Sequence, residues 1–78
     1  MNNVDKAIDL IGMRCPLVAI KVQYHMRMLA KDQILQVVSD DPLSEIDVTY
    51  LCKEHNYILV DINKDADKGN ISFTIQKI

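Results

Sequence analysis

Apolar and polar residues alternate without a break over residues 70–76, near the end of the chain. Such a period of two predicts a β-strand that turns one face to the core and the other to water. The positions expected to face the core are Ile71, Phe73 and Ile75. Those expected to face water are Ser72, Thr74 and Gln76.

Three other short segments are apolar and rich in β-branched residues, which is typical of strands. They are Lys6–Ile11, Gln33–Ser39 and Tyr57–Ile62. In the first of them, Ile8 and Leu10 share one face. The polar segment Asn63–Gly69 predicts the loop of a hairpin, with the glycine supplying the turn.

Two helical segments separate these strands. The first is expected from Pro16 to about Ala30, with Pro16 at the first helical position, where a missing N–H costs nothing. The second follows Asp40-Asp41-Pro42, which reads as capping acids before a proline. Asn56 suits a left-handed position at the end of this helix. The apolar residues of the helix recur at helical spacing and are Leu43, Ile46, Tyr50 and Leu51.

The predicted order is therefore βαβαββ. Two strand–helix–strand units followed by a hairpin give a mixed four-stranded sheet. Because the last strand has a wet face, we expect both helices on the other face, in a two-layer α/β (α+β) sandwich. The 78 residues are expected to form a single domain.

The first helix carries two apolar stripes that lie well apart around its axis. One is formed by Val18, Val22, Met26 and Leu29, and the other by Leu17, Ile20, Tyr24 and Met28. Both stripes are buried if the second helix wraps around a wide apolar face. Otherwise the second stripe is a docking surface for a partner protein.

Composition narrows the possible partners and compartments. The net charge of −2 gives no electrostatic support for direct binding to nucleic acid. No apolar run is long enough to span a membrane, and the first residues lack the features of a signal peptide. We therefore expect a cytoplasmic, reducing location, in which a disulfide between Cys15 and Cys52 is disfavoured.

The candidate chemistry lies in Gly12-Met13-Arg14-Cys15-Pro16, where a strand ends at a glycine turn and a helix begins. A helix N-terminus stabilises a thiolate. Half-ionising a thiol at neutral pH requires lowering its pKa by about 1.5, or ~2 kcal/mol. The helix end typically supplies ~0.3–1 kcal/mol. The Arg14 guanidinium is the expected source of the remainder.

The other residues that could act in catalysis or bind a metal have simpler structural explanations. Cys52 lies on the apolar face of a helix, where cysteine behaves as a small hydrophobe. His25 is more than two helical turns from Cys15, which is too far to act as its base. His55 lies at the end of the second helix, where a positive charge is favourable. The ligand spacings of a metal site are absent, so we expect no metal. Thiol exchange at Cys15 would also need no bound cofactor.

These residues resemble the TusA/SirA-like sulfur-carrier family over nearly the whole chain. The resemblance rests on residues 8–17 around the Cys-Pro turn, on Asp40-Asp41-Pro42, and on Leu51-Cys52-Lys53. The sequence departs from the family pattern at two places. Val18 replaces the second proline of Cys-Pro-x-Pro, and Asn56-Tyr57 replaces Gly-His.

The resemblance implies a sulfurtransferase that acts as a persulfide carrier. Cys15 would accept sulfane sulfur from a cysteine desulfurase or a rhodanese-like protein and pass it to a thiol of an acceptor protein. Arg14 would stabilise the thiolate, Gly12 would form the turn, and Pro16 would position Cys15. Related proteins serve tRNA thiolation and other sulfur pathways. The donor's pyridoxal phosphate would belong to the partner, and this chain would be a monomer or weak homo-oligomer.

Two other functions fit the residues. The chain could be a non-catalytic interaction or regulatory module that binds through its second apolar stripe, with Cys15 incidental. Alternatively, it could be a thiol redox protein that uses both cysteines.

Overall fold

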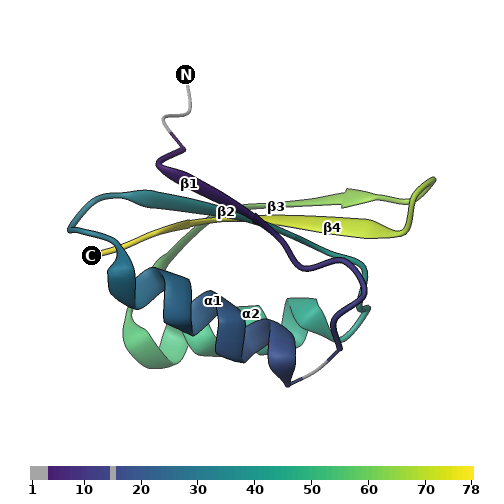
Figure 1. Ribbon diagram of the computed structural model, residues 1–78, viewed down its shortest axis with the longest axis horizontal. Coiled ribbons are helices and arrows are strands. Elements are labelled where there is room, and N and C mark those ends of the chain that lie inside the picture. The colour runs from purple at the N-terminus through teal and green to yellow at the C-terminus, as the bar shows by residue number, and fades with distance from the viewer. Residues whose placement is uncertain (1–3, 15) are drawn as a thin grey trace.

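The computed structural model describes residues 4–14 and 16–78. The described elements are β1 (Lys6–Asp9), α1 (Leu17–Met28), β2 (Ile34–Ser39), α2 (Ser44–His55), β3 (Ile58–Asp65) and β4 (Asn70–Gln76). Figure 1 shows one sheet with both helices packed against the same face. The predicted βαβαββ order and two-layer arrangement are confirmed.

The four strands form one sheet in the order β1-β2-β4-β3. Strands β1 and β2 are parallel, whereas β4 pairs antiparallel with β2 and β3, so the sheet is mixed. Strand β4 lies between β2 and β3, and its alternating apolar side chains Ile71, Phe73 and Ile75 are buried in the core. Thr74 is an exception on the opposite face: it is 8% exposed, because it lies between Gln36 and Asp61 of the neighbouring strands.

Strand β3 is longer than its polar sequence predicts. The hairpin loop expected over residues 63–69 is reduced to 66–69, since Asn63, Lys64 and Asp65 pair with β4. Ladder hydrogen bonds to an adjacent strand thus outweigh the low strand propensity of these residues. The register shifts between Leu59 and Asp61, which marks a β-bulge in this edge strand.

The apolar core lies between the sheet and the helices. Helix α1 contributes Val18, Val22 and Met26, each fully buried, and α2 contributes Val48, Leu51 and Cys52. The helix ends differ slightly from the prediction: α1 ends at Met28 instead of about Ala30. Residues 4–14 and 16–78 contain no helix long and apolar enough to cross a membrane.

Two polar contacts fix the far ends of the helices. The Lys77 Nζ group donates to the Met26 carbonyl at 2.8 Å. This contact satisfies a backbone acceptor in the last turn of α1. Asn56 ends α2 with φ 62°, the predicted left-handed conformation. The next N–H, of Tyr57, donates to the Cys52 carbonyl at 2.9 Å.

Candidate functional site

The segment between β1 and α1 is a tight turn closed by a backbone hydrogen bond and by carboxylates that accept from its N–H groups. Gly12 has φ 91°, a region that favours glycine because a side chain would be strained there. Before it, the Ile11 N–H donates to Asp9 Oδ1 at 2.9 Å. The Met13 N–H donates to the Leu10 carbonyl at 3.1 Å, which closes the turn.

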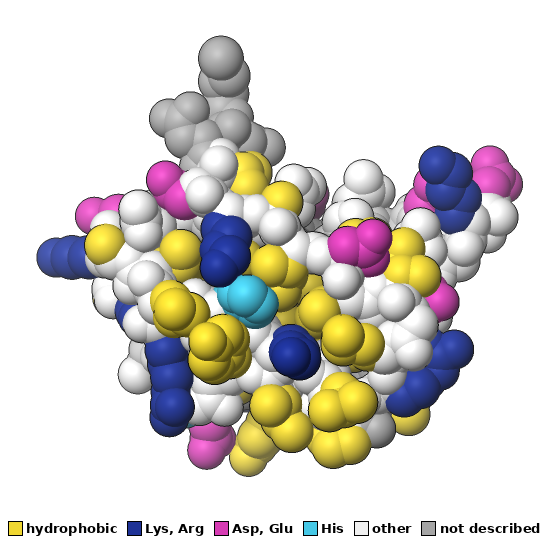
Figure 2. All heavy atoms as spheres, viewed as in Figure 1, with side chains coloured by type: hydrophobic (Ala, Val, Ile, Leu, Met, Phe, Trp, Pro, Cys, Tyr) yellow, Lys and Arg dark blue, Asp and Glu magenta, His cyan; other side chains and the backbone are white. Residues whose placement is uncertain are grey.

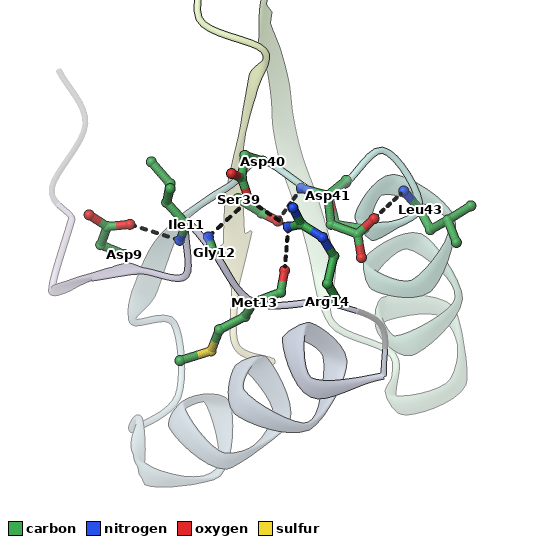
Figure 3. Close-up of polar contacts among 10 residues, drawn as sticks. Asp9, Ile11, Gly12, Met13, Arg14, Ser39, Asp40, Asp41 and Leu43 are labelled. Carbon is green, nitrogen blue, oxygen red and sulfur yellow. Dashed lines mark hydrogen bonds and ion pairs between the residues drawn. The ribbon is translucent and has the colours of Figure 1, made fainter.

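Asp40 ties this turn to the end of β2. Its Oδ1 accepts hydrogen bonds from the Gly12 N–H at 3.0 Å and from Arg14 Nη1 at 3.1 Å. Figure 3 shows these three residues converging from two loops. They meet because β1 and β2 are parallel neighbours, so the segments that follow the two strands begin at the same end of the sheet. The prediction that Asp40 caps the second helix is therefore wrong.

The contacts of Asp40 also set its ionisation. The Gly12 N–H first, and then the Arg14 guanidinium, hold the pKa of the carboxyl below its ordinary value of 3.8. Arg14 remains largely exposed, with 63% of its side chain accessible, and its Nη1 also donates to the Met13 carbonyl at 3.2 Å. The guanidinium is thus anchored at the turn through Nη1.

Asp41 does help to begin α2. Its Oδ1 accepts from the Leu43 N–H at 3.1 Å, and its carbonyl accepts from Ser44 Oγ at 2.6 Å. Helix α2 therefore begins at Ser44, two residues beyond Pro42 of the predicted start.

Cys15, the predicted sulfur acceptor, lies outside the described residues. The residues on either side of it are described. The Leu17 N–H donates to the Arg14 carbonyl at 2.7 Å, and the Ile20 N–H donates to the Pro16 carbonyl at 3.2 Å. Pro16 is therefore the N-cap residue of α1, and the first helical residue is Leu17, one position after the one predicted.

The two apolar stripes of α1 have different environments. The first faces the sheet, whereas Leu17, Ile20, Tyr24 and Met28 are 50%, 55%, 57% and 63% exposed. The alternative in which α2 covers both stripes is therefore wrong. Helix α2 itself packs beside α1 and leaves this side uncovered.

A second exposed apolar set, which the sequence pattern did not predict, lies on α2 and the residue before it. Leu43, Ile46 and Tyr50 recur at helical spacing with Leu51, yet Leu51 is buried and the other three are 55–68% exposed. Ser44 and Val48 take the core positions instead. Figure 2 shows hydrophobic side chains gathered over the side of the molecule on which the helices lie.

Cys52 is poorly suited to redox chemistry. It is 3% exposed within the core, and burial raises the pKa of its thiol to about 11. The thiolate that disulfide exchange requires is thus strongly disfavoured at neutral pH. This burial confirms the prediction that Cys52 is structural and weighs against a two-cysteine redox protein.

Each of the two histidines contacts a tyrosine ring. Burial first, and then Lys6 and Lys21, lower the pKa of His25, which contacts Tyr24 edge to face. His55 stacks on Tyr57 at the end of α2. Within the described part of the chain, no three His, Cys, Asp or Glu side chains are grouped as metal ligands would be.

Solved structures share the fold. A crystal structure of a SirA-like protein from Desulfitobacterium hafniense superposes with a TM-score of 0.81, covering 91% of this chain and 95% of the other at 22% identity. The likeness supports the arrangement of helices and strands described above.

Curated proteins are similar in sequence. A candidate sulfur carrier protein of Escherichia coli strain K12, YedF, is 35% identical over 79 residues, which cover 99% of this chain and all of YedF. A candidate sulfur carrier protein of Aquifex aeolicus is 36% identical over 70 residues. The match covers 87% of this chain but 36% of the Aquifex protein, so this chain spans about a third of that relative.

The sequence model of the family described as "Sulfurtransferase TusA" matches residues 6–77, nearly the whole chain. The match includes the turn held by Asp40 and both helices. Val18, at the position where the resemblance predicts a second proline, is a fully buried core residue of α1. The chain belongs to the TusA family of sulfurtransferases.

Proposed function

We propose that this protein is a sulfur carrier that accepts sulfane sulfur as a persulfide on Cys15 and passes it to a thiol of an acceptor protein. The observation that carries the proposal is the family match over residues 6–77, which includes Gly12-Met13-Arg14-Cys15-Pro16. The sulfur-carrier relatives from E. coli and A. aeolicus support it.

The transfer needs no net oxidation or reduction. The Cys15 thiolate attacks the terminal sulfur of a donor persulfide, the donor's S–S bond breaks, and the donor leaves as a thiolate. A new S–S bond then joins Cys15 to the transferred sulfur. An acceptor thiolate attacks that sulfur in turn and releases the Cys15 thiolate.

Arg14 is the proposed source of positive charge for the thiolate. Both hydrogen bonds described for its guanidinium are made by Nη1, to Asp40 and Met13. Nε and Nη2 make no hydrogen bond among the described residues, and an arginine carries five N–H donors in all. In this proposal Asp40 positions Arg14 and Gly12, while Pro16 begins the helix whose N-terminus favours the thiolate.

The proposed partners are a sulfur donor, either a cysteine desulfurase or a rhodanese-like protein, and an acceptor in tRNA thiolation or another sulfur pathway. They would dock on the exposed stripe of α1, which consists of Leu17, Ile20, Tyr24 and Met28. The proposed location is the cytoplasm, because a carrier thiol must stay reduced between transfers.

Mass spectrometry tests this function. Incubation with a cysteine desulfurase and cysteine is expected to add about 32 Da, the mass of one sulfur atom, to the intact protein. The adduct should be lost on treatment with dithiothreitol and should be absent from Cys15→Ser. Cys52→Ser is the matched control and should load normally. If no sulfane donor loads the wild-type protein, or if Cys15→Ser loads equally, the proposal is overturned.

The exposed stripe also favours a second candidate, a non-catalytic interaction module. In that case a partner would bind through α1 whether or not Cys15 is present. Binding that survives Cys15→Ser but is lost in Tyr24→Ala, together with failure of persulfide loading, would favour the module.

A further inference from the structure

A groove runs between α1 and α2, with a volume of about 350 Å³. Pro16 and Ala19 form the α1 side of its lining, and Ile46 and Tyr50 contribute apolar surface from α2. Pro16 directly follows Cys15 in the sequence, so the groove reaches the segment that carries the proposed sulfur acceptor. An occupant of the groove would therefore contact the N-terminal end of α1.

Two carboxylates of α2 also line this groove, Asp47 and Glu54. They are two helical turns apart, roughly 10 Å along the axis, and thus lie on the same side of the helix. Neither takes part in an ion pair among the described residues, whereas nearby Glu45 is paired with Lys64 at 2.7 Å. The groove therefore combines apolar walls with two carboxylates that form no ion pair among the described residues, and His55 lies at its border.

Of the two carboxylates, Asp47 has an oxygen atom that lacks a hydrogen-bond donor in the described part of the chain. Its Oδ2 atom is buried and has no hydrogen-bond partner among the described residues. A buried carboxylate oxygen without a donor is unfavourable, and a cation bound to the accessible part of the same carboxylate would offset that cost. A cationic donor would also neutralise the charge.

We infer that this groove docks a segment of a partner protein in which a large apolar side chain stands next to a lysine or arginine. The apolar side chain would pack against Ile46 and Tyr50, and the cation would donate to Asp47. A second basic residue would reach Glu54. The inference rests on the proposed function, since the partner is the donor or acceptor of the sulfur on Cys15.

Selection of random peptides displayed on phage against the immobilised protein tests the chemistry of the occupant. We expect the selected peptides to carry Lys or Arg beside Leu, Ile, Met or an aromatic residue. In titrations of a fluorescent copy of the best peptide, Asp47→Asn is expected to raise Kd about tenfold, and added salt should weaken binding. Glu54→Gln should have a smaller effect in the same direction.

Glu45→Gln is the matched control, because its carboxylate is already paired with Lys64 and does not line the groove. It should bind the peptide as the wild type does, and melting curves should show that every variant is folded. The inference is overturned if selection yields acidic peptides or none, or if Asp47→Asn binds unchanged. It is also overturned if the protein sediments as a dimer that Ile46→Glu dissociates, because a second copy would then fill the groove.

Peptide binding should be retained in Cys15→Ser, because the groove does not need the thiol. If the wild-type protein binds the peptide but accepts no persulfide from any sulfane donor, only the proposed function is overturned. If the protein accepts persulfide normally but Asp47→Asn does not weaken peptide binding, only the inference about the groove is overturned.

Discussion

Among single residues, Asp40 does most to shape the turn that precedes α1. One carboxylate oxygen accepts from a backbone N–H and from a guanidinium, so the turn and the arginine are held together. Arg14 is exposed and Asp40 is half-buried, and ion pairs at the surface contribute little to the free energy of unfolding. The importance of Asp40 is therefore geometric: it fixes where Gly12 and Arg14 lie relative to the end of β2.

The depressed pKa of Asp40 predicts an acid-induced loosening of the turn. The contacts favour the ionised carboxyl, so their contribution is present above the ordinary pKa of 3.8 and is lost as the pH falls through the lower folded-state value. We expect the amide resonance of Gly12 to titrate below pH 3.8. The titration should vanish in Asp40→Asn and persist in Asp67→Asn. A midpoint at or above 3.8 would contradict the assignment.

The Cys52 thiol should be unreactive toward thiol reagents in the folded protein. In Cys15→Ser, a thiol reagent at neutral pH is expected to react fully only after denaturant is added, since burial raises the pKa of Cys52 to about 11. The same raised pKa favours the protonated folded state. The resulting stability is present below the ordinary value of 9.0 and is lost as the pH rises toward 11. Rapid labelling of the native protein would refute this.

The residues of the site differ in how far the sequence could predict them. The turn at Gly12 and the burial of Cys52 follow from local pattern. The role of Asp40 does not follow from local pattern, because Asp-Asp-Pro is also a typical sequence for capping a helix. Its contacts depend on the parallel pairing of β1 with β2, a tertiary feature that only the strand order could have suggested.

Helix α1 is an element with two apolar faces. One is buried against the sheet, and the other is exposed along the whole length of the helix. Helical spacing predicted both stripes, but spacing carries no information about which face a neighbouring helix covers. For α2 the same limitation led to an error, since Ile46 and Tyr50 share the period of Leu51 and yet lie outside the core.

Two methionines of α1 give a matched test of these faces. Met26 is fully buried, so Met26→Ala should lower the free energy of unfolding by about 2–5 kcal/mol. Met28 is 63% exposed. Met28→Ala should therefore change the free energy of unfolding by less than about 0.5 kcal/mol. Urea unfolding monitored by circular dichroism measures both. Equal losses would mean that Met28 is covered in solution.

The end of α2 offers a second test at this scale. Asn56 has φ 62°, which is unfavourable for a residue with an ordinary side chain. Asn56→Ala is expected to reduce the free energy of unfolding by about 1 kcal/mol. Asn56→Gly, which accepts this conformation without strain, should be within about 0.5 kcal/mol of the wild type. If alanine is tolerated as well as glycine, the left-handed cap is not what ends the helix.

The whole molecule presents its apolar surface on the helical layer. Figure 2 shows this surface interrupted by separate basic side chains, while the core behind it is a single cluster. Hydrophobic patches of this kind on a small protein mark interaction sites. Docking on this layer would bring a partner to the N-terminal end of α1, where Pro16 follows Cys15 in the sequence.

Tyr24 tests docking without disturbing the core. Tyr24→Ala should leave the melting temperature unchanged, because the side chain is 57% exposed. It is expected to slow persulfide loading from a desulfurase about fivefold or more, as loss of an interface aromatic does, while loading from small polysulfides stays the same. The control is Ile58→Ala, which removes an exposed apolar side chain from β3. Equal slowing by both variants would contradict docking on α1.

The β-bulge of β3 restricts how this molecule can associate. Edge strands are templates for aggregation, and bulges and charges along an edge oppose the addition of another strand. Strand β3 has its bulge between Leu59 and Asp61 and carries Lys64 and Asp65 near its end, while the opposite edge, β1, is four residues long. Both sheet edges are thus poorly suited to strand addition. In the proposed function the protein must release each partner after one transfer, and such sheet edges would disfavour lasting β-sheet contacts and leave the helices for docking.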